Sequence, residues 1–487
     1  GAYNLTKVGS STYTLSGTNT YTGDTTISAG TIKLTGSVNA LTDLTIASGA
    51  TLDLQSIQTF ATLDLDGTIS RSAGSSALTI TGASDLGGSI TTSGSQTYSG
   101  AVTLSGGDRI LTGTTVNFGS TLAGGANALT ITGNVDLDGA ATNLSTLSVS
   151  GISNLGADVT TSSTQTYSDA VVLSNDVILT TTDSNITFSS TIDGDGTARD
   201  LTLTLGSGSA SITGIVGTTS LADITLNSSA TFNAAITATN LTIAANKTAT
   251  VKDDVTIAST IALSGSSTLE VINTSAMTIA GTITDTGTGN SITVNDNDAN
   301  TAPNIVTFSG TVAADTLYIG TATTAGHAKF TGTTGPTITS ITITGGNHAN
   351  EDSTATFNYA LTSTDITLDD NTGDAYLIFA ENNSVTIAGT IDGAANGEGN
   401  LVVSGQIKTF SGNVGSTNPL NFIVQASAVF NGTLNASSTT IEADFSAPSL
   451  VISGDITINA NITTVGIQTY AGNVIIDSNV NLTTTNN

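Results

Sequence analysis

The sequence contains no cysteine and no tryptophan, and its 487 residues include only four prolines and one methionine. Without cysteine the chain has no disulfide, no thiolate metal site and no thiol nucleophile. Aromatic residues make up only 4% of the chain, so its core has to be built from Val, Ile, Leu, Ala and Thr, which suits a narrow, regular interior. No apolar run is long enough to cross a bilayer, so we expect no membrane insertion.

Positive charge is also scarce. Nine Lys and Arg stand against 37 Asp and Glu, which gives a formal net charge of −28. Nucleic-acid binding needs a basic surface, and anionic membranes repel an acidic protein, so neither is expected as a partner. An acidic surface can instead attract divalent cations.

A stretch built around Gln-Thr-Tyr occurs three times, at residues 82–112, 151–181 and 454–485. Its tyrosines are Tyr98, Tyr167 and Tyr470, and a short Val-containing strand pattern follows each of them. Internal repeats indicate an architecture in which each unit packs on its neighbours, which lifts the size limit of a single globular core. We expect the repeated tyrosine to stack on another aromatic ring, inside the fold or at a corner of it.

Between these repeats, apolar residues alternate with Thr, Ser or Asp, as in Leu129-Thr-Ile-Thr-Gly133, and Gly, Asn, Ser and Asp supply turns. Period two predicts β-strands with one apolar face, and no stretch has a helical pattern. The fold class is therefore all-β. We expect an elongated parallel β-solenoid, with tandem β-sandwich domains as the alternative, because the apolar positions are uniform, proline is rare and no linker separates modules. Residues 1–487 are predicted to form one continuous solenoid, with a more irregular, loop-decorated section at 296–374 that holds His327 and His348.

Residues Gly17–Leu34, GTNTYTGDTTISAGTIKL, resemble the autotransporter-associated β-strand repeat, and the Gln-Thr-Tyr units resemble repeats of filamentous-haemagglutinin-like bacterial surface proteins. The resemblance implies a right-handed β-helical passenger that is secreted or displayed at the cell surface. The expected location is therefore extracellular.

The residues favour a non-catalytic protein. Ser and Thr occur everywhere, so a Ser near an Asp carries no information, and the carboxylates are thinly scattered. Calcium is the stronger chemical candidate, because it takes oxygen ligands from Asp and Asn. The candidate ligands are turn carboxylates: Asp193, Asp195, Asp296, Asp298, Asp369 and Asp374. The alternative is that such residues bond their own backbone and only cap turns. No cofactor is required.

The sequence thus predicts an extracellular structural or adhesive protein of bacteria, an adhesin-like stalk or fibre subunit. The alternatives are a coat subunit that assembles end to end, as in filaments or surface layers, and a β-helical carbohydrate-active enzyme. Residues 481–487 stop inside the repeat unit and both ends read as uncapped strands, so we hypothesise either an excerpt of a longer protein or end-to-end self-association. The ligand, whether a host cell, another surface or a glycan, is not specified by the sequence.

Overall fold

The structure, a computed structural model, describes residues 1–296, 304–380, 385–452 and 454–485. These residues form strands β1 to β56, joined by turns and loops, and they contain no helix. The chain folds as an all-β parallel β-solenoid of about 23 turns, which confirms the predicted fold class. Both units are built from parallel strand pairings, whereas the sheets of a tandem β-sandwich are antiparallel.

Contacts within the chain divide it into two compact units, Gly1–Ala238 and Thr239–Asn487. The boundary falls inside β31 (Ile236–Ile243). That residues 1–487 form one continuous solenoid stays a prediction.

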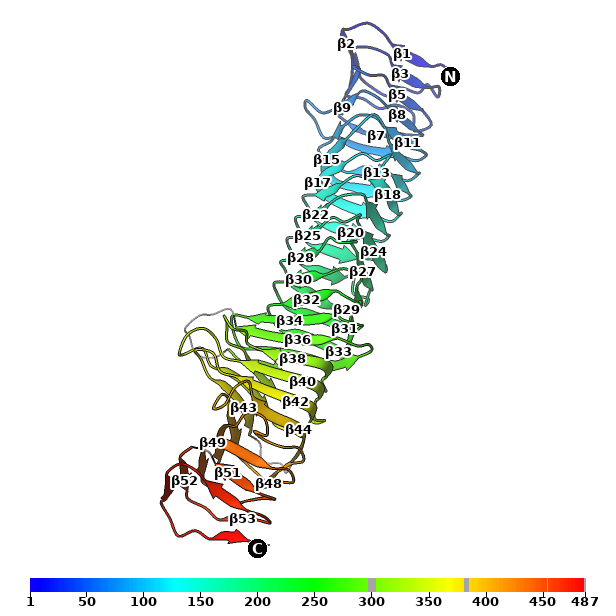
Figure 1. The fold of residues 1–487 in the computed structure, drawn as a ribbon. Helices are drawn as coiled ribbons and strands as arrows, with labels where there is room; N and C mark the ends of the chain where they lie inside the picture. Colours follow the sequence, from blue (N-terminus) through cyan, green and yellow to red (C-terminus); the bar gives the residue numbers. More distant parts are fainter. Residues whose placement is uncertain (297–303, 381–384, 453, 486–487) are drawn as a thin grey trace. The chain divides into compact units, whose positions relative to one another are not determined.

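In the first unit each full coil adds one strand to each of three parallel ladders, and the strands of successive coils lie beside each other (Figure 1). The first ladder contains β1 (Leu5–Lys7), β3 (Thr25–Ile27), β5 (Leu44–Ile46), β8 (Leu63–Leu65), β11 (Ser84–Leu86), β14 (Val102–Leu104), β16 (Leu122–Ala123), β18 (Ala141–Leu144), β21 (Val159–Thr161), β24 (Val177–Thr180) and β27 (Leu201–Thr204). The second contains β2 (Thr12–Leu15), β4 (Thr31–Leu34), β6 (Thr51–Leu54), β9 (Thr68–Ser70), β12 (Ile90–Thr91), the first halves of β15 (Arg109–Phe118) and β17 (Leu129–Leu137), β19 (Leu147–Val149), β22 (Gln165–Tyr167), β25 (Ile186–Phe188), β28 (Ala210–Ile212) and β30 (Ala230–Phe232). The third contains β7 (Ile57–Phe60), β10 (Ala77–Ile80), β13 (Gln96–Tyr98), the second halves of β15 and β17, β20 (Ser153–Leu155), β23 (Val171–Leu173), β26 (Ile192–Gly194) and the start of β29 (Val216–Leu226).

The second unit uses longer strands, several of which turn a corner and serve two ladders. They are β33 (Val255–Leu263), β35 (Met277–Asp285), β38 (Ala313–Ile319), β40 (Thr337–Thr344), β42 (Leu361–Asp369), β44 (Val385–Gly393) and β49 (Leu434–Ile441). The other strands are β32 (Thr248–Val251), β34 (Thr268–Asn273), β36 (Ser291–Asp296), β37 (Val306–Phe308), β39 (His327–Phe330), β41 (Ser353–Phe357), β43 (Ala375–Phe379), β45 (Asn400–Val403), β46 (Lys408–Phe410), β47 (Leu420–Val424), β48 (Ala428–Phe430), β50 (Phe445–Ala447), β51 (Leu450–Ile452), β52 (Ile456–Ile458), β53 (Ile462–Thr464), β54 (Gln468–Tyr470), β55 (Val474–Ile476) and β56 (Leu482–Thr484).

The period-two sequence pattern produces this fold because a strand sends alternate side chains to opposite faces. In β22, Gln165 and Tyr167 are fully buried while Thr166 between them faces outward. The same buried, half-buried, buried order recurs in β25, β30 and many other strands. The inward residues form the narrow aliphatic core, and the outward residues are mostly Thr, Ser, Asn and Asp.

In the second unit, aromatic rings from successive coils stack inside the solenoid. Phe308, Phe330 and Phe357 lie in register on β37, β39 and β41, with ring centroids 4.9 and 4.6 Å apart and nearly parallel planes. Phe379 on β43 continues the stack at 5.9 Å from Phe357. We call these four residues the phenylalanine stack.

Candidate functional site

The Gln-Thr-Tyr unit is an internal clamp. The Tyr167 hydroxyl donates to Gln165 Oε1 at 3.0 Å, and Gln165 Nε2 donates to the carbonyl oxygen of Thr180 in the next coil at 3.0 Å. The Tyr167 ring stacks on Phe188 with centroids 5.2 Å apart. Burial raises the pKa of the Tyr167 hydroxyl well above its usual value, so the group stays a neutral donor.

The other two copies repeat the clamp. Tyr98 donates to Gln96, whose amide donates to Thr112 O at 2.9 Å, and the ring stacks on Phe118. Tyr470 donates to Gln468 at 2.8 Å, although this copy is only partly buried. For Tyr98 and Tyr167, the expectation of a stacked internal aromatic is confirmed.

Asp and Asn side chains at the turns brace successive coils. In a recurring contact, the side-chain Oδ1 accepts the backbone N–H of a residue 17 to 26 positions later, in the following coil. The bracing residues include Asn4, Asp108, Asn134, Asp158, Asp176, Asn185, Asp193, Asp254, Asp352, Asp392, Asn413, Asp444, Asp455 and Asn461. Such bonds satisfy donors that would otherwise lack a partner at the corners of the coil. For Asp193, the one calcium candidate in this set, the side chain therefore bonds the following coil rather than only its own turn.

Asp193 and Asp195, the first two calcium candidates, have separate partners. Asp193 Oδ1 accepts the N–H of Thr219 at 2.9 Å and the Thr218 hydroxyl at 2.5 Å. Asp195 forms an ion pair with Arg199 at 2.9 Å. The hydrogen bond from Arg199, together with the N–H of Thr197, holds the pKa of Asp195 below its usual value.

The other candidates lie in the second unit. Asp296 ends β36 and is almost buried, where its oxygens accept the backbone and side-chain N–H groups of Asn304 at 3.3 and 3.4 Å. Asp298 lies outside the described residues. Asp369 ends β42, and the nearby Asp374 accepts the Tyr376 hydroxyl at 3.1 Å.

Asp370 lies between Asp369 and Asp374 in the sequence, and its carboxylate accepts two backbone N–H groups. Its oxygens accept the N–H groups of Ala375 and Gly399, both at 2.7 Å. Burial raises its pKa, with Asp374 and Asp369 adding to the shift. Across the described residues, no three His, Cys, Asp or Glu side chains converge in a way that could hold a metal ion. Calcium binding stays a prediction.

Three loops of the section at 296–374 each lie between a long strand and the shorter strand that follows it. The loops at 320–326, 345–352 and 370–374 follow β38, β40 and β42. Asn371 donates to the carbonyl oxygen of Ala322, two coils earlier in the chain, at 2.8 Å. His327 begins strand β39 rather than lying in a loop, and burial lowers its pKa.

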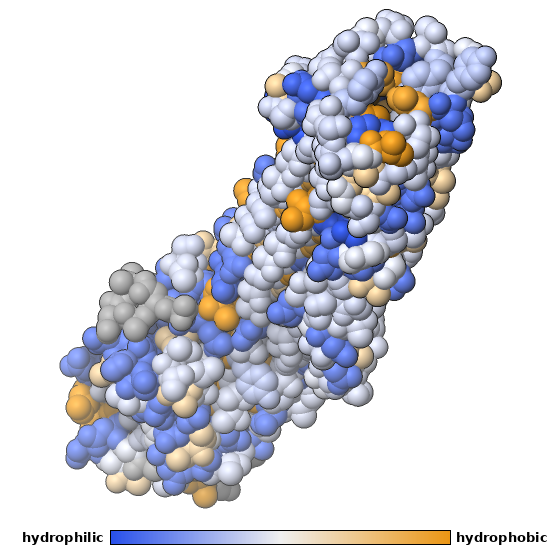
Figure 2. Space-filling model, turned by 90° about the horizontal axis from the view of Figure 1, so that it is seen from above, coloured by the Kyte–Doolittle hydropathy of each residue, from blue (hydrophilic) through white to orange (hydrophobic). Residues whose placement is uncertain are grey.

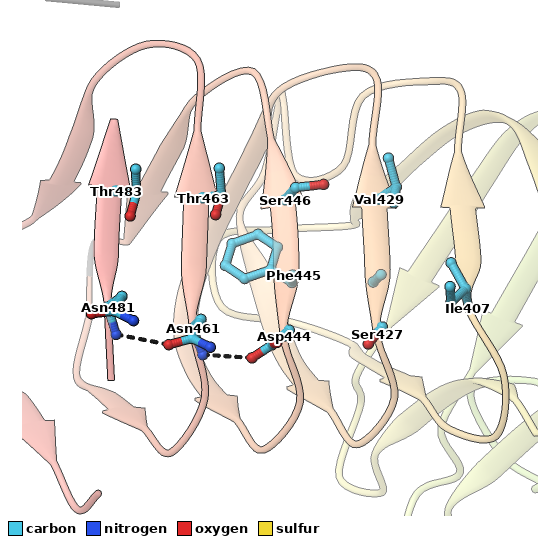
Figure 3. Close-up of a pocket in the computed structure, with 11 residues that line it drawn as sticks. Ile407, Ser427, Val429, Asp444, Phe445, Ser446, Asn461, Thr463, Asn481 and Thr483 are labelled. Atoms are coloured by element: carbon cyan, nitrogen blue, oxygen red, sulfur yellow. Dashed lines mark hydrogen bonds between the residues drawn. The ribbon is translucent and has the colours of Figure 1, made fainter. Parts of the chain in front are cut away.

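A shallow hollow of about 430 Å³ lies on β46, β48, β50, β53 and β56 (Figure 3). Asp444, Asn461 and Asn481 form a row along it, in which each N–H donates to the preceding side-chain oxygen at 2.9 and 2.8 Å. Ser446 and Thr463 line the hollow beside this row. Asp444 is the only carboxylate among its lining residues, whereas glycoside hydrolysis ordinarily needs a pair.

The exposed side of the second ladder, from β17 to β30, is a flat array of hydroxyl groups, which we call the hydroxyl face. Figure 2 shows the pale, weakly polar surface typical of such residues over much of the visible side. Its central row runs in unbroken register through Thr130, Ser148, Thr166, Thr187, Ser211 and Thr231. Its two flanking rows are Thr146, Thr164, Asn185, Ser209 and Ser229, and Thr132, Ser150, Ser168, Ser189, Thr213 and Asn233.

None of these positions carries a charge or a large apolar group, and all are at least partly exposed. The sequence gives Ser and Thr at alternate positions throughout, so this face could not be singled out before the ladders were known.

Among the described residues, no helix has the length and hydropathy needed to cross a membrane. Residues 5–34, which contain β1 to β4, match the passenger-associated-transport-repeat family model. No curated protein and no solved structure matches the chain. The segment that resembles the autotransporter-associated β-strand repeat therefore also matches the passenger-associated-transport-repeat model, and it folds as the first strands of a parallel β-solenoid.

Proposed function

We propose that this chain is an extracellular, non-catalytic adhesive passenger, which a bacterium secretes or displays so that its solenoid surface contacts other surfaces. The match of residues 5–34 to the passenger-associated transport repeat carries the proposal. The buried Gln and Tyr side chains and the turn carboxylates support the proposal, because they hydrogen-bond one coil to the next. Gln165 and Tyr167 clamp the interior, and Asp193 and Asp444 brace the turns.

The experiment has two readouts. Beads coated with the purified chain are passed over polysaccharide-coated and cell-coated surfaces under flow, and released reducing ends or unsaturated sugars are assayed in parallel. We expect retention without product release. Release of sugars would contradict the proposal in favour of the carbohydrate-active enzyme.

Location is tested separately on intact producing cells, where added protease and antibody should reach the chain. A chain that stays protected until the cells are lysed would contradict an extracellular role. End-to-end self-association stays a prediction.

A further inference from the structure

The hydroxyl face has the geometry of a regular two-dimensional grid. Adjacent coils of a parallel ladder are about 4.8 Å apart, and alternate residues along a strand are about 6.6 Å apart. The register from Thr130 to Thr231 contains no bulge, so the central hydroxyls follow one another coil by coil. The central row therefore extends over successive coils within the strands, and most residues of the two flanking rows lie in the bends and loops just beyond the strand ends.

The clamp beneath the face makes it stiff. Thr166 lies between Gln165 and Tyr167, whose side chains are hydrogen-bonded and fully buried below it. In the next strand Thr187 pairs with Thr166 on the outer side, and the adjacent residue Phe188 points inward and stacks on Tyr167. Little backbone freedom therefore remains to be lost when a ligand binds.

The hydroxyls of the central row are available to a ligand, whereas Ser150, Asn185 and Ser209 in the flanking rows already form hydrogen bonds within the protein. In the described part of the chain, the hydroxyls of Ser148, Thr166, Thr187 and Ser211 have no hydrogen-bond partner, and their side chains are at least partly exposed. Each hydroxyl can donate one hydrogen bond and accept others, and it rotates to suit its partner.

Charge selects the class of ligand. In the same coils, the central row of the third ladder reads Asp136, Asn154, Val172 and Asp193, whereas the hydroxyl face is neutral in a chain of net charge −28. A neutral face in an acidic protein suits a neutral ligand with many hydroxyl and ether oxygens, since it avoids burying any charge. The flat face exposes no aromatic ring, so it offers no stacking platform for a single sugar.

We propose that the hydroxyl face binds a neutral, extended polysaccharide presented on a solid surface. The polymer's hydroxyl groups donate and accept hydrogen bonds, and its acetal oxygens accept them. Many weak hydrogen bonds can then form together along a straight chain that crosses successive coils. The row contains both Ser and Thr, whose hydroxyls rotate freely. Such hydroxyls can pair with polymer oxygens that differ in position and orientation. This inference rests on the proposed adhesive function and names its ligand class and binding face.

The purified full chain is mixed with increasing amounts of microcrystalline cellulose, and the protein left in solution is measured. An anionic polyuronate gel serves as the charged comparison. We expect retention on cellulose that changes little with salt, because no ion pair is formed, and no retention on the gel. The T166V/T187V variant should lose at least about fivefold in partition coefficient, because two hydroxyl contacts are removed without loss of strand propensity.

Two matched variants keep the test decisive. T166S/T187S retains both hydroxyls and should bind like the parent chain. T59V/T79V alters two in-register outward threonines of the third ladder and should also bind like the parent. Equal loss in T59V/T79V, no effect of T166V/T187V, or no retention on cellulose would overturn the assignment.

If the chain does not bind cellulose while chain-coated beads still adhere to cells, only the assignment of the hydroxyl face is contradicted. If cellulose binding succeeds but the chain is not reached on intact cells, the proposed extracellular role falls.

Discussion

The two units fill their interiors in different ways. In the first unit, tyrosine rings pair singly with phenylalanine, Tyr98 on Phe118 and Tyr167 on Phe188, and each tyrosine brings a buried glutamine. In the second, the phenylalanine stack needs no polar partner. A buried hydroxyl requires a hydrogen-bond acceptor, whereas a buried hydrocarbon ring requires only contact.

The outer surfaces differ in a related way. In the first unit an outer row such as Thr130 to Thr231 stays in regular register. The second unit inserts loops such as 345–352 after its long strands. Regular coils can repeat the same contact along an extended ligand. Loops can change in length and sequence without disturbing the strands that they connect.

The largest expected effect separates the two kinds of interior. Phe357→Ala removes a buried ring stacked on both Phe330 and Phe379, and it should lower the free energy of unfolding by about 3–5 kcal/mol. Phe232→Ala is the matched control, since Phe232 is equally buried and, among the described residues, has no ring partner. It should cost less by about 0.5–1.5 kcal/mol per missing ring pair. Urea unfolding measures both, with hydrogen exchange at β41 and β30 to localise the loss. Equal costs would show that stacking adds nothing beyond burial.

The next effect concerns the clamp. Gln165→Ala leaves the Tyr167 hydroxyl and the Thr180 carbonyl without their partner inside the coil, which should cost about 1–3 kcal/mol for each unsatisfied group. Gln468→Ala makes the same change in a partly exposed copy, where water replaces the lost bonds. Its cost should stay below about 1 kcal/mol. Amide hydrogen exchange at β22 and β54 reports the two sites, and a reversed order would refute the clamp.

A smaller effect tests the brace against calcium binding. Asp193→Ala removes bonds to Thr218 and Thr219 and should cost about 1 kcal/mol, whereas Asp193→Asn keeps an acceptor oxygen and should cost less. We expect neither variant to change the response of the melting temperature to calcium after chelation. If Asp193 is instead a calcium ligand, both variants would lose a calcium-dependent rise in melting temperature that the parent chain shows.

The smallest effect is in pH dependence. Burial acts to raise the pKa of Asp53, but hydrogen bonds from Ser72 and Gln55 outweigh it, so the pKa lies below its usual value. Its stabilising contribution is therefore present above the ordinary carboxyl pKa and is lost as pH falls through the lowered one. Burial raises the pKa of Asp370, so that residue stabilises the fold most below the ordinary carboxyl pKa and loses this contribution as pH rises.

Carboxyl carbon resonances followed by NMR during a pH titration measure both groups directly. Asp53 should titrate at lower pH than Asp370, and the opposite order would contradict the hydrogen-bond geometry at one of the two sites. Asp53→Asn and Asp370→Asn identify the resonances.

Much of the strand architecture follows from the sequence because alternation is a local property. The pattern around Thr166 places Gln165 and Tyr167 inside with no knowledge of the rest of the chain. The partners of the turn carboxylates were not predictable in this way. The N–H that Asp193 accepts belongs to Thr219, 26 residues later, and its position depends on the length of the coil between them.

The Gln-Thr-Tyr repeat marks the boundary between what the sequence and the tertiary structure each determine. By itself the sequence predicts a stacked aromatic and a following strand at each copy. The tertiary structure places β13 with Tyr98 on the third ladder and β22 with Tyr167 on the second. The reason is that the repeat does not span a whole number of coils, so identical local patterns reach different faces. The hydroxyl face exists because coils of unequal length nevertheless bring Thr130, Ser148, Thr166 and Thr187 into one register, and only the stacking of whole coils sets that register.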